Sequence, residues 1–144
     1  ILCAANLDPR ALAIEVTESA AITNLEMTAR VTKALQAMGV RISLDNFGTG
    51  YSSFSHLQNL FFDTIKIDRS FIGKEDSRLN WSIVDAVINI SSVSELRVIA
   101  EGIENEEQAA RLTQGGCVFG QGFFYSEAVP ASDALHMIEA EAAA

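Results

Sequence analysis

The sequence predicts an α/β fold in which parallel strands alternate with helices. Two patterns carry this prediction: short β-rich runs alternate with stretches of helical apolar spacing, and strand-like runs end in polar residues. Strands that are separated by helices pair in parallel, with right-handed crossovers. The chain has 144 residues, of which 49% are hydrophobic and 20% charged. These values suit one globular domain over 1–144.

The first half of the chain is expected to contain three strands with a helix after each of the first two. The predicted strands are 12–16, 40–45 and 64–68. Apolar residues recur at helical spacing from Met27 through Val31 to Met38, and Gly39 ends that helix. A short helix is predicted over 51–60.

The second half continues the alternation. A helix over 79–91 is expected to place Ile83, Val87 and Ile90 on one face. The remaining predicted elements are a strand at 96–101, a helix from Asn105 to Gly115, a strand at 118–121 and a last helix from Ser132. Asn105 is the predicted N-cap of its helix, with Gln108 as its capping-box partner.

Five β-α units leave two architectures open. They are too few for a closed eight-stranded barrel and suit an open sheet. A parallel barrel gathers strand-end side chains on its C-terminal rim, whereas a doubly wound sheet gathers ligands at one switch point. Each predicted strand carries one polar residue in it or at its end: Glu15, Asp45, Lys66, Glu101 and Gln121.

Charge and composition exclude several classes of function. The net charge is −9 and no run of Lys or Arg occurs, so we expect no binding of duplex nucleic acid. No apolar stretch is long enough to span a membrane, so this segment is not expected to insert into one. The sequence contains no HExxH, P-loop, GxSxG or GxGxxG motif.

The cysteines indicate a reducing compartment. Cys3 and Cys117 lie in apolar surroundings without CxxC or Cys/His spacing, so both are predicted to be buried free thiols. We expect either a cytoplasmic protein or the cytosolic portion of a larger, membrane-anchored one.

Each strand-end residue has an ordinary interpretation and a functional one. Glu15 suits an edge strand in solvent or a metal ligand, and Asp45 suits a tight turn or a ligand. Lys66 either snorkels at an edge or faces carboxylates, where it can hold a water or a phosphate oxygen. Oxygen ligands favour Mg²⁺ or Mn²⁺, and two such ions can activate water against a phosphodiester.

Four segments closely resemble the second part of the EAL domain family. They are AIEVTES, ISLDNFGTGYSSFSHLQNLFFDTIKIDRSFI, VIAEGIENEEQ and GQGFFYSEAVP. The resemblance runs from about residue 8 to 135, and 136–144 forms the end of the last helix and an alanine-rich tail. It implies a bacterial cyclic di-GMP phosphodiesterase with a TIM-like (β/α) barrel. This chain would supply about five β-α units, with the N-terminal part of the barrel missing.

The resemblance also implies roles for individual residues. The implied metal ligands for two Mg²⁺ or Mn²⁺ ions are Glu15, Asp45, Asn46 and Glu101. The implied catalytic residues are Lys66, Glu101 and Gln121, supported by Glu104 and Asp68. The implied loop that couples the site to a homodimer interface around 47–60 consists of Phe47, Gly48, Thr49 and Gly50, and Glu18 is implied to steady it. From its sequence position, Asp68 is expected to pair with Lys66 or Arg69.

Three departures from the family pattern qualify these roles. Asn46 stands where the family has a second Asp, which removes one anion from the site. The Glu-Ala-Leu signature and an upstream metal-binding asparagine are absent from this chain, as expected for a truncated domain. Ser126-Glu127-Ala128 replaces the common Ser-Arg-Pro.

Three hypotheses follow for the parent protein. The first is an enzyme that hydrolyses cyclic di-GMP to linear pGpG in bacterial signalling, with the isolated 144 residues inactive. The second is a degenerate domain that acts as a cyclic di-GMP receptor or an interaction module, which Asn46 favours. The third is a folding unit whose function resides in a fused GGDEF or sensor domain.

Overall fold

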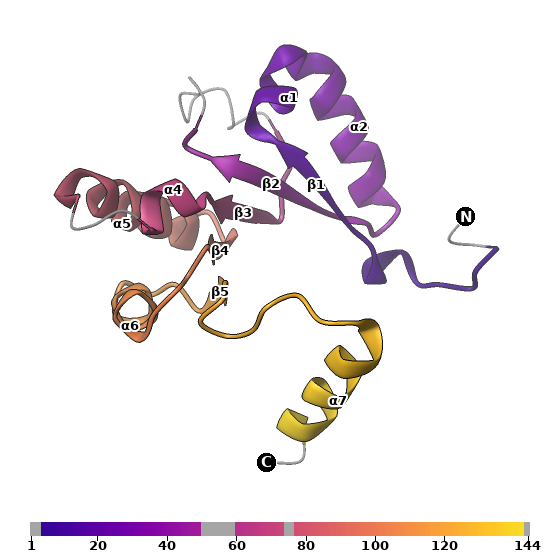
Figure 1. Cartoon of the computed structure of the whole chain (residues 1–144). Coiled ribbons are helices and arrows are strands. Elements are labelled where there is room, and N and C mark those ends of the chain that lie inside the picture. Colours follow the sequence, from indigo (N-terminus) through magenta and orange to yellow (C-terminus); the bar gives the residue numbers. More distant parts are fainter. Residues whose placement is uncertain (1–3, 50–59, 74–76, 143–144) are drawn as a thin grey trace.

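Five parallel strands form one sheet in the computed structural model, which describes residues 4–49, 60–73 and 77–142 (Figure 1). The strands are β1 (Ala13–Thr17), β2 (Arg41–Phe47), β3 (Thr64–Ile67), β4 (Arg97–Glu101) and β5 (Phe119–Gln121). The helices are the 3-10 turn η1 (Pro9–Ala11), α1 (Glu18–Thr23), α2 (Leu25–Ala37), α4 (Arg69–Ile72), α5 (Arg78–Val93), α6 (Glu106–Gln114) and α7 (Ala131–Ala142).

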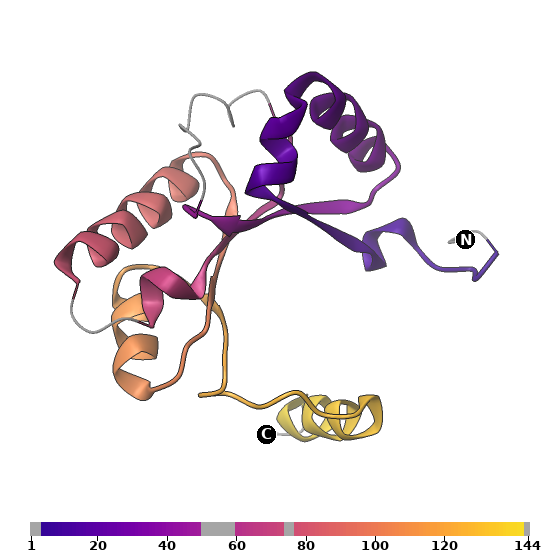
Figure 2. The ribbon, with the colours of Figure 1, turned by 45° about the horizontal axis from the view of Figure 1, so that its top comes forward.

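The strand order decides between the two architectures that the sequence leaves open. The order in space is β1-β2-β3-β4-β5, and every neighbouring pair is parallel. A doubly wound sheet reverses its order at a switch point, whereas a (β/α) barrel adds its strands in sequence. The chain therefore has an α/β fold made of units of a TIM-like barrel, as the resemblance implies. Figure 2 shows the sheet curving, with α2, α5 and α6 on its convex side.

The hydrophobic core lies between the convex side of the sheet and these helices. Leu44, Ile65 and Ile67 from the strands belong to one buried cluster with Val84 and Val87 of α5. Because successive side chains of a strand point to opposite faces, the residues between them face the concave side. The polar strand-end residues therefore lie opposite the core.

The buried face of α5 matches the predicted one only in part. Val87 is buried and Ile83 is partly buried against the core, whereas Ile90 is 42% exposed. Trp81 and Val84, which were not predicted, are buried as well. The spacing from Met27 to Met38 predicted helix α2 correctly, but Met27 and Val31 are exposed. In both helices apolar residues lie on more than one side, so their spacing alone does not indicate which side is buried. The helix predicted over 51–60 lies almost entirely outside the described residues.

A β-bulge in β2 changes the alternation at the most polar point of the sheet. Leu44 pairs with Ile65 and Phe47 pairs with Ile67, so two residues of β2 stand opposite the single Lys66. The two are Asp45 and Asn46, and Asn46 has a left-handed φ of 54°. Leu44 and Phe47 are both buried in the core. The bulge therefore lets two consecutive polar residues face away from the core.

The C-terminal helix is placed differently from the others. After β5 the chain runs in an extended path to α7, which lies apart from the sheet in both ribbon views (Figures 1 and 2). Leu135, Met137 and Ile138 of this helix are exposed. No helix in the described part of the chain has both the length and the apolar character needed to cross a membrane.

Candidate functional site

The ammonium group of Lys66 lies among three carboxylates from three other strands. Its Nζ is 2.7 Å from Glu15 Oε1, 2.7 Å from Glu101 Oε1 and 3.5 Å from Asp45 Oδ1. The Lys66 side chain is only 9% exposed, whereas that of Glu15 is 52% exposed. Strands β1 to β4 each contribute one of these residues, so the parallel order of the sheet assembles the cluster.

The environment of Lys66 keeps it charged. Burial disfavours the ammonium, but the bonds to Glu101 and Glu15 and the nearby charge of Asp45 outweigh burial and raise the pKa of Lys66 above its ordinary value. Lys66 is therefore a fixed cation and hydrogen-bond donor at neutral pH, and it has no proton-accepting role.

The side chains near Lys66 carry oxygen atoms of the kind that hard divalent cations prefer. Asp45 Oδ1 is buried and has no hydrogen-bond partner among the described residues, although it lies 3.5 Å from the Lys66 ammonium. The next residue in the chain, Asn46, carries an amide oxygen. Carboxylate and amide oxygens are the ligands that Mg²⁺ and Mn²⁺ prefer. Over the described ranges, however, no three His, Cys, Asp or Glu side chains group closely enough to form a metal site by themselves. The carboxylates converge on the Lys66 ammonium instead.

A rim pocket with a volume of about 310 Å³ adjoins this cluster. Five of the residues predicted for the site line it: Asn46, Asp68, Glu101, Glu104 and Gln121. Gln121 pairs with Glu101 in the register of β4 and β5, which brings both to the same end of the sheet. The cluster and the pocket share Glu101, so they form one continuous site at the C-terminal ends of the strands.

Gly122 brings the Gln121 backbone close to the chain after β4. A Cβ at position 122 would lie 2.0 Å from the Ile103 carbonyl oxygen. The Ile103 N–H donates to the Gln121 carbonyl at 3.1 Å, and the Phe124 N–H donates to the Ile103 carbonyl at 3.0 Å. Only glycine fits this contact, which holds Gln121 beside the pocket.

Glu18 lies beneath the loop that follows β2. It is 2% exposed, and its Oε2 accepts a hydrogen bond of 2.7 Å from the Gly48 N–H. Gly48 has a φ of 95° and faces the Phe71 ring, and the Thr49 hydroxyl donates to the Asn46 carbonyl at 2.9 Å. Gly50 and most of the proposed dimer segment lie outside the described residues.

The two predicted supporting residues, Asp68 and Glu104, are held at the rim by hydrogen bonds at the N-terminal ends of α4 and α6. Asp68 accepts a hydrogen bond of 2.8 Å from the Ser70 N–H and caps α4. The expected pairing of Asp68 with Lys66 or Arg69 is wrong, because the Lys66 ammonium contacts the three strand carboxylates. At the start of α6, Asn105 accepts from the Gln108 N–H at 3.0 Å, and Gln108 Oε1 accepts from the Glu104 N–H at 2.7 Å.

Sequence reasoning missed four residues that line the pocket: the glycines Gly102 and Gly122, and two residues with large side chains, Arg69 and Phe123. Arg69 and Phe123 each follow the end of a strand by two residues, Arg69 after Ile67 and Phe123 after Gln121. Arg69 is the first residue of α4, and Phe123 lies in the turn after β5. From the strand pattern alone, only polar residues in strands or at their ends were predicted for the site, whereas these two lie just beyond.

Comparison with known proteins places this geometry in a family. The family model for the EAL domain matches residues 1–128. The bifunctional diguanylate cyclase/cyclic di-GMP phosphodiesterase MucR of Pseudomonas aeruginosa is 41% identical over 132 residues, which are 90% of this chain and 19% of that protein.

Solved structures agree with the sequence match. The PaMucR phosphodiesterase in complex with c-di-GMP superimposes with a TM-score of 0.88 at 39% identity, covering 92% of this chain and 54% of that one. The manganese/cy-diGMP complex of Klebsiella pneumoniae BlrP1 has a TM-score of 0.78 at 36% identity, covering 85% of this chain and 31% of that one. The chain thus spans about half of the PaMucR chain in the solved structure. It spans a smaller part of the whole MucR protein and of the BlrP1 chain. On its motifs, its fold and its family-model match, the chain belongs to the EAL domain family.

Proposed function

We propose that the parent protein hydrolyses cyclic di-GMP to linear pGpG. The observation that carries this proposal is the meeting of three carboxylates and one buried lysine at the carboxyl ends of four parallel strands. In barrels of this type the active site occupies that rim. The family match and the relative bound to c-di-GMP support the choice of substrate.

The four proposed metal ligands would hold Mg²⁺ or Mn²⁺ on the open side of the cluster. They are Glu15, Asp45, Asn46 and Glu101. Bound ions supply a more acidic water and stabilise the leaving oxygen of a phosphodiester. The Oδ1 of Asp45, which has no hydrogen-bond partner among the described residues, and the manganese complex of a relative support this assignment.

The residues of the chain have distinct tasks in the proposed reaction. The attacking water adds to phosphorus, one P–O3′ bond breaks, and the released 3′ oxygen takes up a proton. Lys66 donates a hydrogen bond that orients the water and balances developing negative charge. We assign to Glu101 the acceptance of the water proton, since it faces both Lys66 and the pocket. Gln121 positions a phosphate oxygen through its amide.

Asn46 favours a second function, a receptor that binds cyclic di-GMP without cleaving it. Its backbone φ of 54° suits Asn, which enters the left-handed region more readily than most residues. The amide thus preserves the bulge while removing one negative charge. A site with one anion fewer holds a divalent cation more weakly, so turnover falls while the shape of the site is kept.

The test compares three forms of the full-length protein: wild type, Asn46→Asp and Asp45→Ala. Each is incubated with cyclic di-GMP and Mn²⁺, and the nucleotides are separated by chromatography. We expect linear pGpG from the wild type, roughly tenfold faster turnover from Asn46→Asp, and none from Asp45→Ala. If the wild type binds intact cyclic di-GMP and only Asn46→Asp cleaves it, the protein is a receptor. If none of the forms binds or cleaves it, both functions are wrong.

We further propose that residues 1–144 alone have no activity and that the parent protein forms a homodimer through 47–60. β1 and β5 each pair on one side only, which leaves two open sheet edges among the described strands. Turnover by the isolated chain would refute the first proposal. A monomeric parent protein in sedimentation analysis would refute the second.

A further inference from the structure

The rim pocket is strongly acidic, with one exception. Asp68, Glu101 and Glu104 contribute negative charge to its lining, and Arg69 is the one cation among the described residues that line it. A phosphodiester is itself an anion, so it is repelled by this wall unless a cation faces it. Arg69 is therefore the one side chain of the described wall that attracts such a ligand by charge.

Arg69 also lacks an internal partner in the described part of the chain. Asp68 caps α4, and Glu101 pairs with Lys66, so two of the three carboxylates that line the pocket have other partners. Other arginines are engaged: Arg10 pairs with Asp8 at 2.6 Å, and the Arg111 guanidinium lies 4.0 Å from the centre of the Trp81 ring. No ion pair, side-chain hydrogen bond or ring contact joins Arg69 to a described residue.

The stem of Arg69 is nevertheless fixed in position. A Cβ at Gly102 would lie 2.3 Å from Arg69 Cβ and 3.2 Å from Arg69 Cα. Gly102 has a φ of 72°, so glycine serves both the backbone angle and the close approach. The backbone just after Glu101 thus packs directly on Arg69. The base of an exposed guanidinium is held against the wall of the pocket, while its charged end is available to a ligand.

We propose that Arg69 binds a phosphate group of the cyclic dinucleotide in the rim pocket and thereby sets affinity rather than the chemical step. The planar guanidinium matches two phosphate oxygens with paired hydrogen bonds, which an ammonium cannot reproduce. This inference rests on the proposed function, since it assumes a phosphodiester ligand. It assigns Arg69 a binding role and leaves the reacting atoms to the cluster around Lys66.

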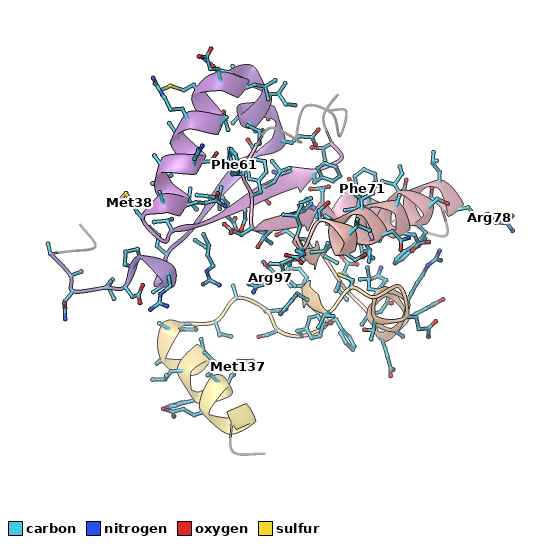
Figure 3. The ribbon with its side chains drawn as sticks, turned by 180° about the vertical axis from the view of Figure 1, so that it is seen from behind. Met38, Phe61, Phe71, Arg78, Arg97 and Met137 are labelled. Atoms are coloured by element: carbon cyan, nitrogen blue, oxygen red, sulfur yellow. The ribbon has the colours of Figure 1, made fainter. Side chains whose placement is uncertain are left out.

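The experiment measures binding of cyclic di-GMP to the full-length protein by calorimetry in Ca²⁺ buffer, with chromatography to verify that the ligand stays intact. Arg69→Gln is expected to weaken binding roughly tenfold, which is about 1.4 kcal/mol. The affinity of Arg69→Lys should lie between those of Arg69→Gln and wild type, because lysine keeps the positive charge but lacks the paired donors of the guanidinium. The matched control is Arg78→Gln: Figure 3 shows Arg78 at one end of α5, pointing away from the strands.

Kinetics separate a binding role from a structural one. In Mn²⁺, Arg69→Gln should raise KM by a similar factor and leave kcat within about threefold of wild type. Equal Kd values for wild type, Arg69→Gln and Arg69→Lys would overturn the inference while leaving the proposed function intact. Folded wild type that binds no cyclic di-GMP would overturn both. If Arg69→Gln fails to fold, Arg69→Lys decides, and wild-type affinity in that variant refutes the paired contact.

Discussion

The two faces of the sheet are made by the same strands and have opposite character. In β3, Ile65 and Ile67 are buried in the core cluster, whereas Lys66 between them faces three carboxylates on the concave side. The convex face is apolar and covered by helices. The concave face is polar, and its three clustered carboxylates exceed the single Lys66 cation in charge. Because of the pleat, neighbouring residues of one strand point to opposite faces, so one stabilises the core and the next belongs to the site.

The bulge in β2 interrupts the regular alternation of core residues and site residues. Strict alternation would give the site one residue between two core residues, but here Asp45 and Asn46 lie together between Leu44 and Phe47. The concave face gains a second oxygen donor without loss of a core side chain. The difference between the faces thus depends on one extra residue as well as on the pleat.

The largest effect is expected on the convex face. Ile67 is 1% exposed, and Ile67→Ala should lower the free energy of unfolding by about 2–5 kcal/mol through lost burial and a cavity. Urea denaturation of the full-length protein measures this loss, and the folded fraction should retain wild-type KM. A loss below about 1 kcal/mol would show that the core does not depend on this face.

A change at the neighbouring residue, Lys66, should affect turnover strongly and stability less. Lys66→Met removes the cation, so we expect turnover of cyclic di-GMP to fall about 100-fold. Stability should fall by only about 1–3 kcal/mol, because the half-exposed Glu15 can turn to water. Parallel assays of turnover and urea midpoint test this. Unchanged turnover would remove Lys66 from the mechanism and weaken the contrast between the faces.

A smaller effect is expected in alkaline solution. The pKa of Lys66 is raised above its ordinary value of 10.5 in the folded protein. Its contribution to stability is therefore fully present below that value and is lost as the pH rises through the higher folded pKa.

Urea midpoints at pH 9 and pH 11.5 in EDTA, for wild type and Lys66→Met, measure this contribution. All other groups are common to the two proteins, so the difference between them isolates Lys66. The wild type should lose more stability than the variant over this interval. An equal loss in the two proteins would contradict the pairing of Lys66 in the folded state.

The smallest effect concerns Cys117, which belongs to the core cluster on the convex side. Burial raises the pKa of its thiol, and the thiol donates to the Phe119 carbonyl at 3.3 Å. At pH 8, alkylation of Cys117 in the folded protein should be at least about tenfold slower than in urea, as peptide mapping can show. Comparable rates would indicate that solvent reaches this side of the sheet.

The sequence predicted the sheet well because strands and their polar ends are local signals. All five strands lie within two residues of their predicted limits, and Glu15, Asp45, Lys66 and Glu101 come together as the strand-end argument requires. Parallel pairing explains this success, since it places like ends of strands at one edge. The prediction that Cys117 is a buried free thiol is confirmed, whereas Cys3 lies outside the described residues.

Packing choices were harder to predict. The buried face of α5 depends on which apolar stripe meets the sheet, and both stripes of that helix satisfy helical spacing. Helix α1 was missed because six residues give too short a period, although Thr17 caps it by accepting from the Ala20 N–H. The bulge at Asn46 was also missed, since it depends on pairing with β3, which sequence alone does not reveal.

The Lys66 ammonium has a consequence for the order in which the domain matures. A zinc finger cannot fold until its metal arrives, because its ligands have no other partner. Here the three carboxylates already converge on a cation that the chain itself supplies. The strands can therefore be joined at their rim during synthesis, independently of the metal supply in the cell. The ion binding that we propose would then be a late, reversible step that follows folding of the sheet.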